Sequence, residues 1–261
     1  MITVLIVGDI VGAPGRRAFG NVATRYKHEG KADVIVVNGE NAAGGSGITL
    51  ALATELLAAG ADVITLGDHT WRQKQIVGEI DSEPRLIRPA NFAPDCPGKG
   101  IVTVPTEKGN ISVINLIGRV FMDSVDCPFR TADQLLDKKN LSRITLVDMH
   151  AEATSEKIAM GRYLDGRVTS VTGTHTHVQT SDETILPAGT AYITDVGMTG
   201  AKDSVIGREW KPVVERFLTG MPQRFNVAED DVALEGVLVK IDETTGRASS
   251  IKRVRERIGR H

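Results

Sequence analysis

Short runs of β-branched and aliphatic residues recur along the chain, and each run ends abruptly in glycine and polar residues. The first three such runs are residues 3–7, 34–37 and 63–66. Between them, residues 14–26 and 49–59 carry helical signals, with Thr49 as a predicted N-cap and Gly60 as a predicted stop. Runs that are apolar throughout are typical of strands buried on both faces, so the pattern predicts an α/β fold with a parallel sheet covered by helices.

The strand pattern continues in the middle of the chain and changes in its last third. Residues 100–104 and 111–117 flank a turn-like segment at 107–110 and predict a hairpin, and 144–147 and 168–171 predict two more buried strands. Residues 184–186, 191–194, 231–241 and 249–255 are typical of antiparallel strands, and we expect them to form a second sheet. Because no Pro-, Gly- or Ser-rich linker divides the chain, we predict one domain over 1–261. The irregular segments 119–130 and 197–225 are expected to form rims or a small cap over a site.

Composition narrows the class of protein. The 261 residues include 31 Lys and Arg against 33 Asp and Glu, a formal charge of −2, which gives no basic field for gripping nucleic acid. Cys96 and Cys127 are too few for a disulfide scaffold or a thiolate metal site. No signal-like start and no apolar run near the roughly 20 residues of a membrane span is present, so we expect a cytoplasmic protein.

Polar side chains that can bind metal ions follow the predicted strands. They are Asp9, Glu40, Asn41, Asp68, His69, His150, His175 and His177. In parallel α/β sheets ligands bind outside the carboxyl ends of the strands, where these residues fall. The most specific single motif among them is the pair His175 and His177. Side chains two residues apart on an extended chain point to the same side, so the two imidazoles can reach one site. Four of the six histidines lie at such strand ends.

Each of these residues, taken alone, has a structural interpretation as well. Asp9 resembles a helix cap or turn former, and Glu40 with Asn41 could hold the turn before the glycines at 44–47. A lone His69 or His150 is more often structural than catalytic. The glycine stretch itself is compatible with a phosphate cradle or with a flexible turn, since it matches no nucleotide-binding motif. The case for metal binding therefore rests on the joint pattern.

The combined ligand set indicates the class of metal. Carboxylate, amide oxygen and imidazole suit Zn, Mn or Fe. Eight candidates are too many for one ion, whereas two ions about 3.5–4 Å apart would use them and would clamp both oxygens of a phosphoryl displacement. The sequence thus predicts two divalent or mixed-valence transition metal ions.

In this order, Asp9, the Gly39-Glu40-Asn41 and Gly67-Asp68-His69 segments, His150 and the 173–177 segment resemble the calcineurin-like metallophosphoesterase superfamily. The segments 8–12 and 38–45, and Thr70-Trp71 after His69, are similar to its YmdB-like bacterial branch. The resemblance covers nearly the whole chain. It implies a four-layer α/β/β/α sandwich, a dinuclear metal centre and hydrolysis of phosphodiesters, with 2′,3′-cyclic nucleotides as the branch's substrate class.

The resemblance also implies a role for each residue. Asp9, Asn41 and His177 would hold one metal, Asp68, His150 and His175 the other, Glu40 would bridge them, and His69 would stand outside as the general acid.

Two positions depart from the wider superfamily. Val11 stands where its Asp-x-His motif has histidine, and Asp68 stands where it has asparagine. A third carboxylate neutralises more metal charge, which should raise the pKa of a bridging water and tighten binding of the second ion.

The resulting hypothesis is a metal-dependent phosphodiesterase in which a metal-bridging hydroxide attacks phosphorus and His69 protonates the leaving oxygen. A phosphomonoesterase is the alternative within enzymes, and a metal-bound regulatory protein with weak catalysis is the alternative outside them. The expected partner is a small phosphodiester substrate rather than a membrane, and a homo-oligomer is compatible with the sequence. The substrate-binding residues are not indicated.

Overall fold

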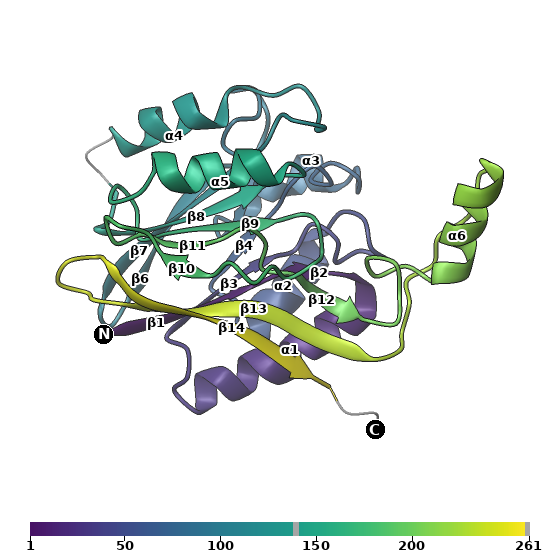
Figure 1. The fold of residues 1–261 in the computed structure, drawn as a ribbon, viewed down its shortest axis with the longest axis horizontal. Helices are drawn as coiled ribbons and strands as arrows, with labels where there is room; N and C mark the ends of the chain where they lie inside the picture. The colour runs from purple at the N-terminus through teal and green to yellow at the C-terminus, as the bar shows by residue number, and fades with distance from the viewer. Residues whose placement is uncertain (138–140, 259–261) are drawn as a thin grey trace.

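The strands form two sheets in the computed structural model, which describes residues 1–137 and 141–258 (Figure 1). The first sheet has the order β2-β12-β13-β1-β3-β4-β5, with β14 paired to β13. Its strands are β1 (Ile2–Val7), β2 (Asp9–Ile10), β3 (Val34–Asn38), β4 (Val63–Thr65), β5 (Leu86–Ile87), β12 (Met198–Ala201), β13 (Val232–Ile241) and β14 (Ala248–Arg257). The second sheet has the order β10-β11-β9-β8-β7-β6. Its strands are β6 (Ile101–Thr106), β7 (Gly109–Ile117), β8 (Ile144–His150), β9 (Ser170–Thr174), β10 (Thr184–Ile185) and β11 (Ala191–Ile193).

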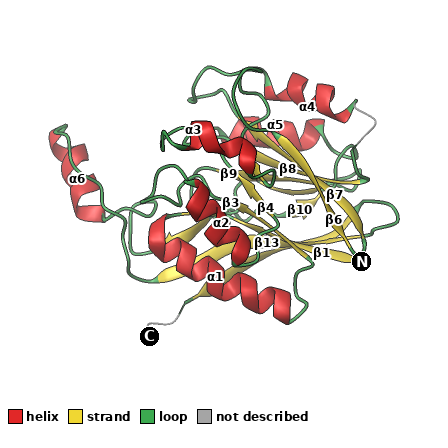
Figure 2. Cartoon of the chain, turned by 180° about the vertical axis from the view of Figure 1, so that it is seen from behind, coloured by secondary structure: helices red, strands yellow, loops and turns green. Residues whose placement is uncertain are grey.

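Helices cover the outer faces of both sheets (Figure 2). The helical elements are α1 (Gly12–His28), α2 (Leu50–Ala58), α3 (Ile76–Glu79), the 3₁₀ turn Ile80–Ser82, α4 (Pro128–Leu136), α5 (Thr154–Tyr163) and α6 (Trp210–Thr219). Of these, α1 and α2 cover the first sheet, and α4 and α5 cover the second. The side chain of Thr49 accepts a hydrogen bond from the Leu52 N–H, which confirms the predicted N-cap of α2.

Alternating side chains of the strands divide the interior into three apolar clusters. Leu5 of β1 packs with Phe19 of α1 on the outer side of the first sheet, whereas Val4 faces inward and packs with Leu146 of β8. On the outer side of the second sheet, Met160 of α5 joins a third cluster. One apolar cluster thus lies between the first sheet and helices α1 and α2, one lies between the two sheets, and one lies between the second sheet and helices α4 and α5. The two sheets confirm the expected α/β fold, and the order of the clusters is consistent with a four-layer α/β/β/α sandwich.

The predicted elements are mostly present, but the expectation that the strands of the last third form a second, antiparallel sheet is wrong. The strands at 3–7, 34–37 and 63–66 are parallel in the first sheet, while 144–147 and 168–171 are parallel in the second, so they do not share one sheet. The segments 231–241 and 249–255 do not form a second sheet, because β13 pairs antiparallel with β1 and β14 pairs with β13. β11 pairs antiparallel with β10, as expected, but parallel with β9, where antiparallel pairing was expected. The hairpin around 107–110 is confirmed.

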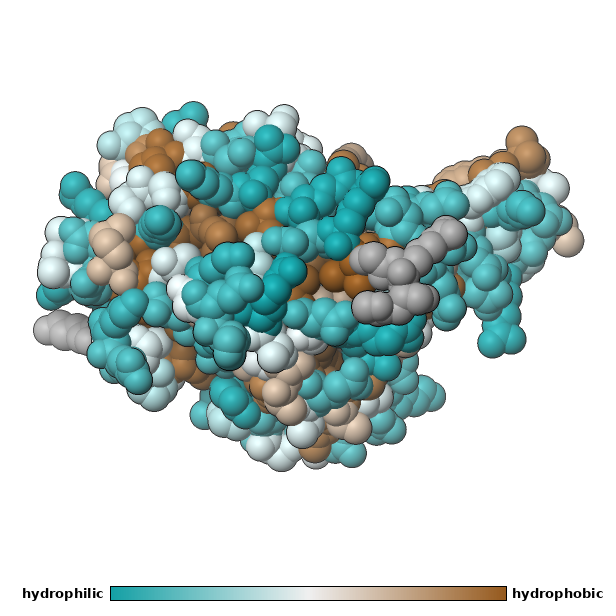
Figure 3. All heavy atoms as spheres, turned by 90° about the horizontal axis from the view of Figure 1, so that it is seen from below, coloured by the Kyte–Doolittle hydropathy of each residue, from teal (hydrophilic) through white to brown (hydrophobic). Residues whose placement is uncertain are grey.

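The two irregular segments have different positions. Residues 119–130 run into α4, and none of them lines the cavity at the candidate site. The segment 197–225 contributes β12, and then α6, which projects from the body (Figure 1). Figure 3 shows apolar residues toward the outer end of this projection, where Phe217 and Leu218 are exposed. Over the described ranges, no helix combines the length and apolar character needed to cross a bilayer.

Candidate metal centre

All eight predicted site residues come together where β1, β3, β4, β8 and β9 end, at the junction of the two sheets. Asp9 follows β1, Glu40 and Asn41 follow β3, Asp68 and His69 follow β4, His150 ends β8, and His175 and His177 follow β9. A chain of contacts links them all. Parallel strands bring their carboxyl ends to one edge, and the two sheets face each other there, so residues far apart in sequence meet.

Four of these residues form a compact group. One ligand atom from each of Glu40, Asp68, His150 and His175 can be chosen so that all four atoms lie within 4.8 Å of one another. Asp68 Oδ1 lies 3.0 Å from His150 Nε2 and 3.2 Å from His175 Nδ1. Glu40 Oε1 lies 3.2 Å from His150 Nε2. The carboxylates thus surround two imidazole nitrogens.

Hydrogen bonds on the outer side of the imidazoles fix which nitrogen faces the group. Thr174 donates its hydroxyl hydrogen to Asp148, so its oxygen accepts from His150 Nδ1 at 2.9 Å. His175 Nε2 lies 3.2 Å from the carboxylate of Glu152, which can only accept. In the neutral rings, the lone pairs of His150 Nε2 and His175 Nδ1 therefore point at each other across 3.0 Å. Such a facing pair of acceptors, with carboxylates around it, fits a bound cation, and outer acceptors of this kind are usual for metal-binding histidines.

A second group lies beside the first. His177 donates Nδ1–H to the carbonyl oxygen of Ile206, which turns Nε2 toward Asp9 Oδ1 at 3.6 Å. Asp9 is fully buried, and its Oδ1 has no hydrogen-bond partner among the described residues. A buried carboxylate oxygen without a donor is costly unless a cation neutralises it, so this pair also fits a metal ion. Asn41 places Nδ2 3.3 Å from His177 Nε2, and it would have to turn its amide to offer oxygen to an ion.

The electrostatics of the centre favour positive charge. Burial raises the pKa of Asp9, but the charge of His177 outweighs burial and holds that pKa well below its usual range. The same balance, with His150 and His175 as partners, lowers the pKa of Asp68. Burial lowers the pKa of His150, but Glu40 and Asp68 raise it far more. The ionised carboxylates thus favour positive charge at the imidazoles, and a divalent cation would supply that charge in place of the proton that the imidazole gives up on binding it.

Gly67 shows how closely the centre is packed. A Cβ atom at this position would lie 2.2 Å from the His150 ring and 2.5 Å from Glu40 Oε2. Only glycine therefore lets the loop after β4 carry Asp68 this close to β8.

His69 stands at the rim. Its Nδ1 donates to Asn41 Oδ1 at 2.7 Å, its backbone N–H donates to Glu40 Oε2 at 3.0 Å, and its Nε2 lies 3.6 Å from Asp68 Oδ2. The side chain is 28% exposed, whereas that of His150 is fully buried. The ring thus reaches solvent with one nitrogen fixed in direction.

A cavity of about 360 Å³ opens over the centre. Five of its lining residues were not singled out for this pocket from the sequence: Gly45, Glu152, Thr176, Ile206 and Arg208. Glu152 follows His150 by two positions at the end of β8, a spacing that could have marked it. Arg208 lies far from every motif, so no sequence signal pointed to it. Of the predicted cap, Ile206 and Arg208 reach the cavity.

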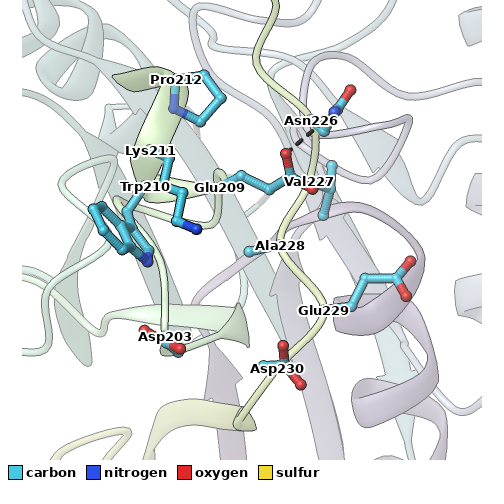
Figure 4. Close-up of a pocket in the computed structure, with 10 residues that line it drawn as sticks. All are labelled: Asp203, Glu209, Trp210, Lys211, Pro212, Asn226, Val227, Ala228, Glu229 and Asp230. Carbon is cyan, nitrogen blue, oxygen red and sulfur yellow. Dashed lines mark hydrogen bonds between the residues drawn. The ribbon is translucent and has the colours of Figure 1, made fainter. Parts of the chain in front are cut away.

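A second cavity, of about 660 Å³, lies at the foot of α6 (Figure 4). Its lining residues are Asp203, Glu209, Trp210, Lys211, Pro212, Asn226, Val227, Ala228, Glu229 and Asp230. None of the predicted metal ligands belongs to it.

Known proteins resemble this chain over most of its length. The 2′,3′-cyclic-nucleotide 2′-phosphodiesterase of Bacillus subtilis is 47% identical over 252 residues, which cover 96% of each protein. The crystal structure of a novel phosphatase from Mycoplasma pneumoniae has a TM-score of 0.92 at 34% identity, over 98% of this chain and 93% of that one. The calcineurin-like phosphoesterase YfkN of Bacillus subtilis shares the fold, with a TM-score of 0.57 at 10% identity over 98% of this chain and 90% of that one.

The family model of YmdB-like proteins matches residues 5–254, which span the strands and every candidate ligand. Together with the identity to the Bacillus phosphodiesterase, this match confirms the resemblance inferred from the motifs. The chain belongs to the YmdB-like protein family.

Proposed function

We propose that this protein is a metal-dependent phosphodiesterase that hydrolyses 2′,3′-cyclic nucleotides or closely related phosphodiesters. The observation that carries the proposal is the pair of imidazole nitrogens 3.0 Å apart, His150 Nε2 and His175 Nδ1, facing each other among carboxylates. The similarity to a 2′,3′-cyclic-nucleotide 2′-phosphodiesterase supports the substrate class.

The proposed ligand sets follow from the two groups of side chains. Asp9, Asn41 and His177 would hold one ion, and Asp68, His150 and His175 the other. Glu40, whose Oε1 faces His150, would contact both. Bound Fe, Mn or Zn ions of this kind supply a nucleophile and neutralise charge on the phosphoryl oxygens.

His69 is proposed to protonate the oxygen that leaves phosphorus. In this structure Asn41 accepts from its Nδ1, and an Asn41 turned toward an ion would instead donate its amide N–H to Nδ1. In both cases Nε2 is the nitrogen left to hold and deliver a proton at the rim of the centre. A histidine suits this role because its ordinary pKa lies near neutrality. Glu40 fixes the His69 backbone through the N–H, which keeps the ring beside the cavity.

The first experiment measures metal content and hydrolysis together. We expect close to two transition metal ions per chain and metal-dependent cleavage of 2′,3′-cyclic AMP and a generic phosphodiester. His69→Ala should keep its metals and lower kcat by about 10²–10⁴-fold, the usual contribution of a general acid. If the variant instead lost its metals, the acid assignment would be wrong. Bound metal without turnover on any ester would favour the regulatory alternative.

A phosphomonoesterase is the second candidate. The similar Mycoplasma structure is described as a phosphatase, and the same residues could position a monoester. Comparing a generic phosphomonoester with the diesters separates the two. Three narrower points remain proposals from the sequence: a cytoplasmic location, one domain over 1–261 whose cap is the part of 197–225 near Ile206 and Arg208, and a homo-oligomer.

A further inference from the structure

Charged groups around the cavity point to a means of selecting substrates. Apart from the predicted ligands and His69, the lining includes two charged side chains, Glu152 and Arg208. Arg208 is hydrogen-bonded to several groups of the protein and Glu152 to few. This difference determines which charge in the cavity is available to act on a bound anion.

Arg208 is tied to the glycine loop. Its guanidinium donates to the carbonyl oxygens of Gly44 at 2.8 Å, of Phe225 at 3.3 Å, and of Gly45. A Cβ atom on Gly45 would lie 2.5 Å from the guanidinium carbon, so the group lies flat against the loop. Held in this way, Arg208 is fixed in place and cannot swing toward a phosphate as a free surface arginine could.

Glu152 is freer. Its side chain is 50% exposed, and one oxygen, Oε2, lies 3.2 Å from His175 Nε2. No Lys or Arg forms an ion pair with it in the described part of the chain. A carboxylate has about four acceptor sites. Glu152 therefore presents negative charge to the cavity, one imidazole ring away from the metal-binding group.

We propose that Glu152 is a specificity-determining residue that disfavours doubly charged phosphomonoesters more strongly than singly charged phosphodiesters. The proposal rests on the proposed function and deepens it. A phosphodiester carries one negative charge, whereas a phosphomonoester carries about −1.5 to −2 at neutral pH because its second pKa is about 6. The additional charge of the monoester is repelled by Glu152, and Arg208, which is held by the carbonyl oxygens of Gly44, Gly45 and Phe225, does not pair with Glu152 to cancel that charge.

The test uses the holoenzyme with Glu152→Gln. Glutamine keeps an oxygen that can accept from His175 Nε2, so the variant removes charge and preserves the hydrogen bond. We expect the ratio of kcat/KM for a generic phosphomonoester to that for 2′,3′-cyclic AMP to rise about five- to tenfold, as expected for unit charges separated by several ångströms near a surface. Because both esters are measured on one preparation, changes in folding or metal loading cancel in this ratio.

Binding gives a second readout that does not need turnover. The affinity for inorganic phosphate, measured by calorimetry, should rise about five- to tenfold more in Glu152→Gln than the affinity for dimethyl phosphate, because the second negative charge of phosphate is repelled in addition to the first. The gain should shrink toward about 1 M salt, where the Debye length falls to about 3 Å. The control Glu107→Gln changes an exposed acid in the β6–β7 turn and should alter neither quantity.

The outcomes separate the two proposals. An unchanged ester ratio and unchanged phosphate affinity in Glu152→Gln would overturn the role of Glu152 even if the wild type hydrolyses diesters. A wild type that hydrolyses no ester would contradict the proposed function, and the phosphate affinities would still decide whether Glu152 repels a dianion.

Discussion

Asp148 supports the candidate centre from behind without belonging to it. The hydroxyls of Thr65 and Thr174 donate to its carboxylate, and Thr174 in turn accepts from His150. Burial raises the pKa of Asp148 to about 6, against an ordinary value of 3.8. The folded chain therefore holds a proton on this residue more tightly than the unfolded chain does.

This pKa predicts a pH-dependent effect of Asp148→Asn. Because the folded pKa is raised, the stability linked to Asp148 is fully present below about pH 4 and is lost as pH rises through about 6. Asparagine does not titrate, so the variant does not lose stability in this way. Between about pH 4 and pH 6, the free energy of unfolding of the variant minus that of wild type should therefore increase by about 2–3 kcal/mol. Urea titrations of both chelated proteins across this range measure the gain. A difference that does not vary with pH would contradict it.

Asp68 predicts a change in metal binding. It lies within 3.2 Å of nitrogens from both His150 and His175, so it is the carboxylate most engaged with the compact group. In Asp68→Asn we expect Mn²⁺ to bind about tenfold more weakly, since one charge is removed, and the acidic limb of the rate profile to move to lower pH. Calorimetry with Mn²⁺ and kcat measured against pH are the checks. Equal affinity would show that Asp68 does not share an ion.

At the scale of elements, α5 anchors the loop that carries two of the histidines. Lys157 of α5 is fully buried and donates to Asp195 Oδ2 at 2.7 Å, and the same oxygen accepts from the Thr176 N–H and hydroxyl. Thr176 lies between His175 and His177, whose φ angles of 104° and 64° are unfavourable for residues with side chains. The buried ion pair therefore holds a strained loop in place.

Removing one partner of this pair should destabilise the protein and loosen the loop. Lys157→Met leaves a buried, uncompensated charge on Asp195, so we expect a loss of about 3–5 kcal/mol in the free energy of unfolding and weaker Mn²⁺ binding. Adding Asp195→Asn to this variant should return part of the stability. Lys252→Met, an exposed change on β14, should stay within about 0.5 kcal/mol. Denaturant unfolding of wild type, Lys157→Met, Lys157→Met with Asp195→Asn, and Lys252→Met measures these differences in the free energy of unfolding.

At the scale of the whole molecule, the centre joins the two sheets. Glu40 and Asp68 extend from the first sheet, and His150 and His175 extend from the second. Figure 1 shows the strands of both sheets lying between α4 and α5 on one side and α1 and α2 on the other. A cation bound among these residues would link the two sheets to each other, in addition to its proposed role in hydrolysis.

Metal removal should therefore lower stability. A chelator should reduce the melting temperature, and Mn²⁺ at about a hundred times its Kd should restore about 2.7 kcal/mol. Glu40→Gln should lose most of this increment, because it removes a ligand that meets His150 across the sheets, whereas His69→Ala should keep it. Calorimetric scans with and without Mn²⁺ measure the effect. An equal increment in all three proteins would place the binding elsewhere.

The sequence by itself determined the local features of the protein. The runs that became β1, β3 and β8, the N-cap at Thr49 and the polar residues at the strand ends all follow from interactions within a few neighbouring residues. Because a strand end in a parallel α/β protein leads to the functional edge, all eight candidate site residues could be singled out without coordinates.

Only the tertiary structure decided how these pieces pair. An alternating or apolar pattern shows that a strand is buried, but it does not show which strand supplies its hydrogen bonds, so the antiparallel pairing of β13 with β1 was missed. The roles of Glu152 and Arg208 at the cavity depend on a fold that brings β8 and the segment after β12 to one rim. Their positions depend on contacts between residues far apart in the chain, which no local pattern encodes.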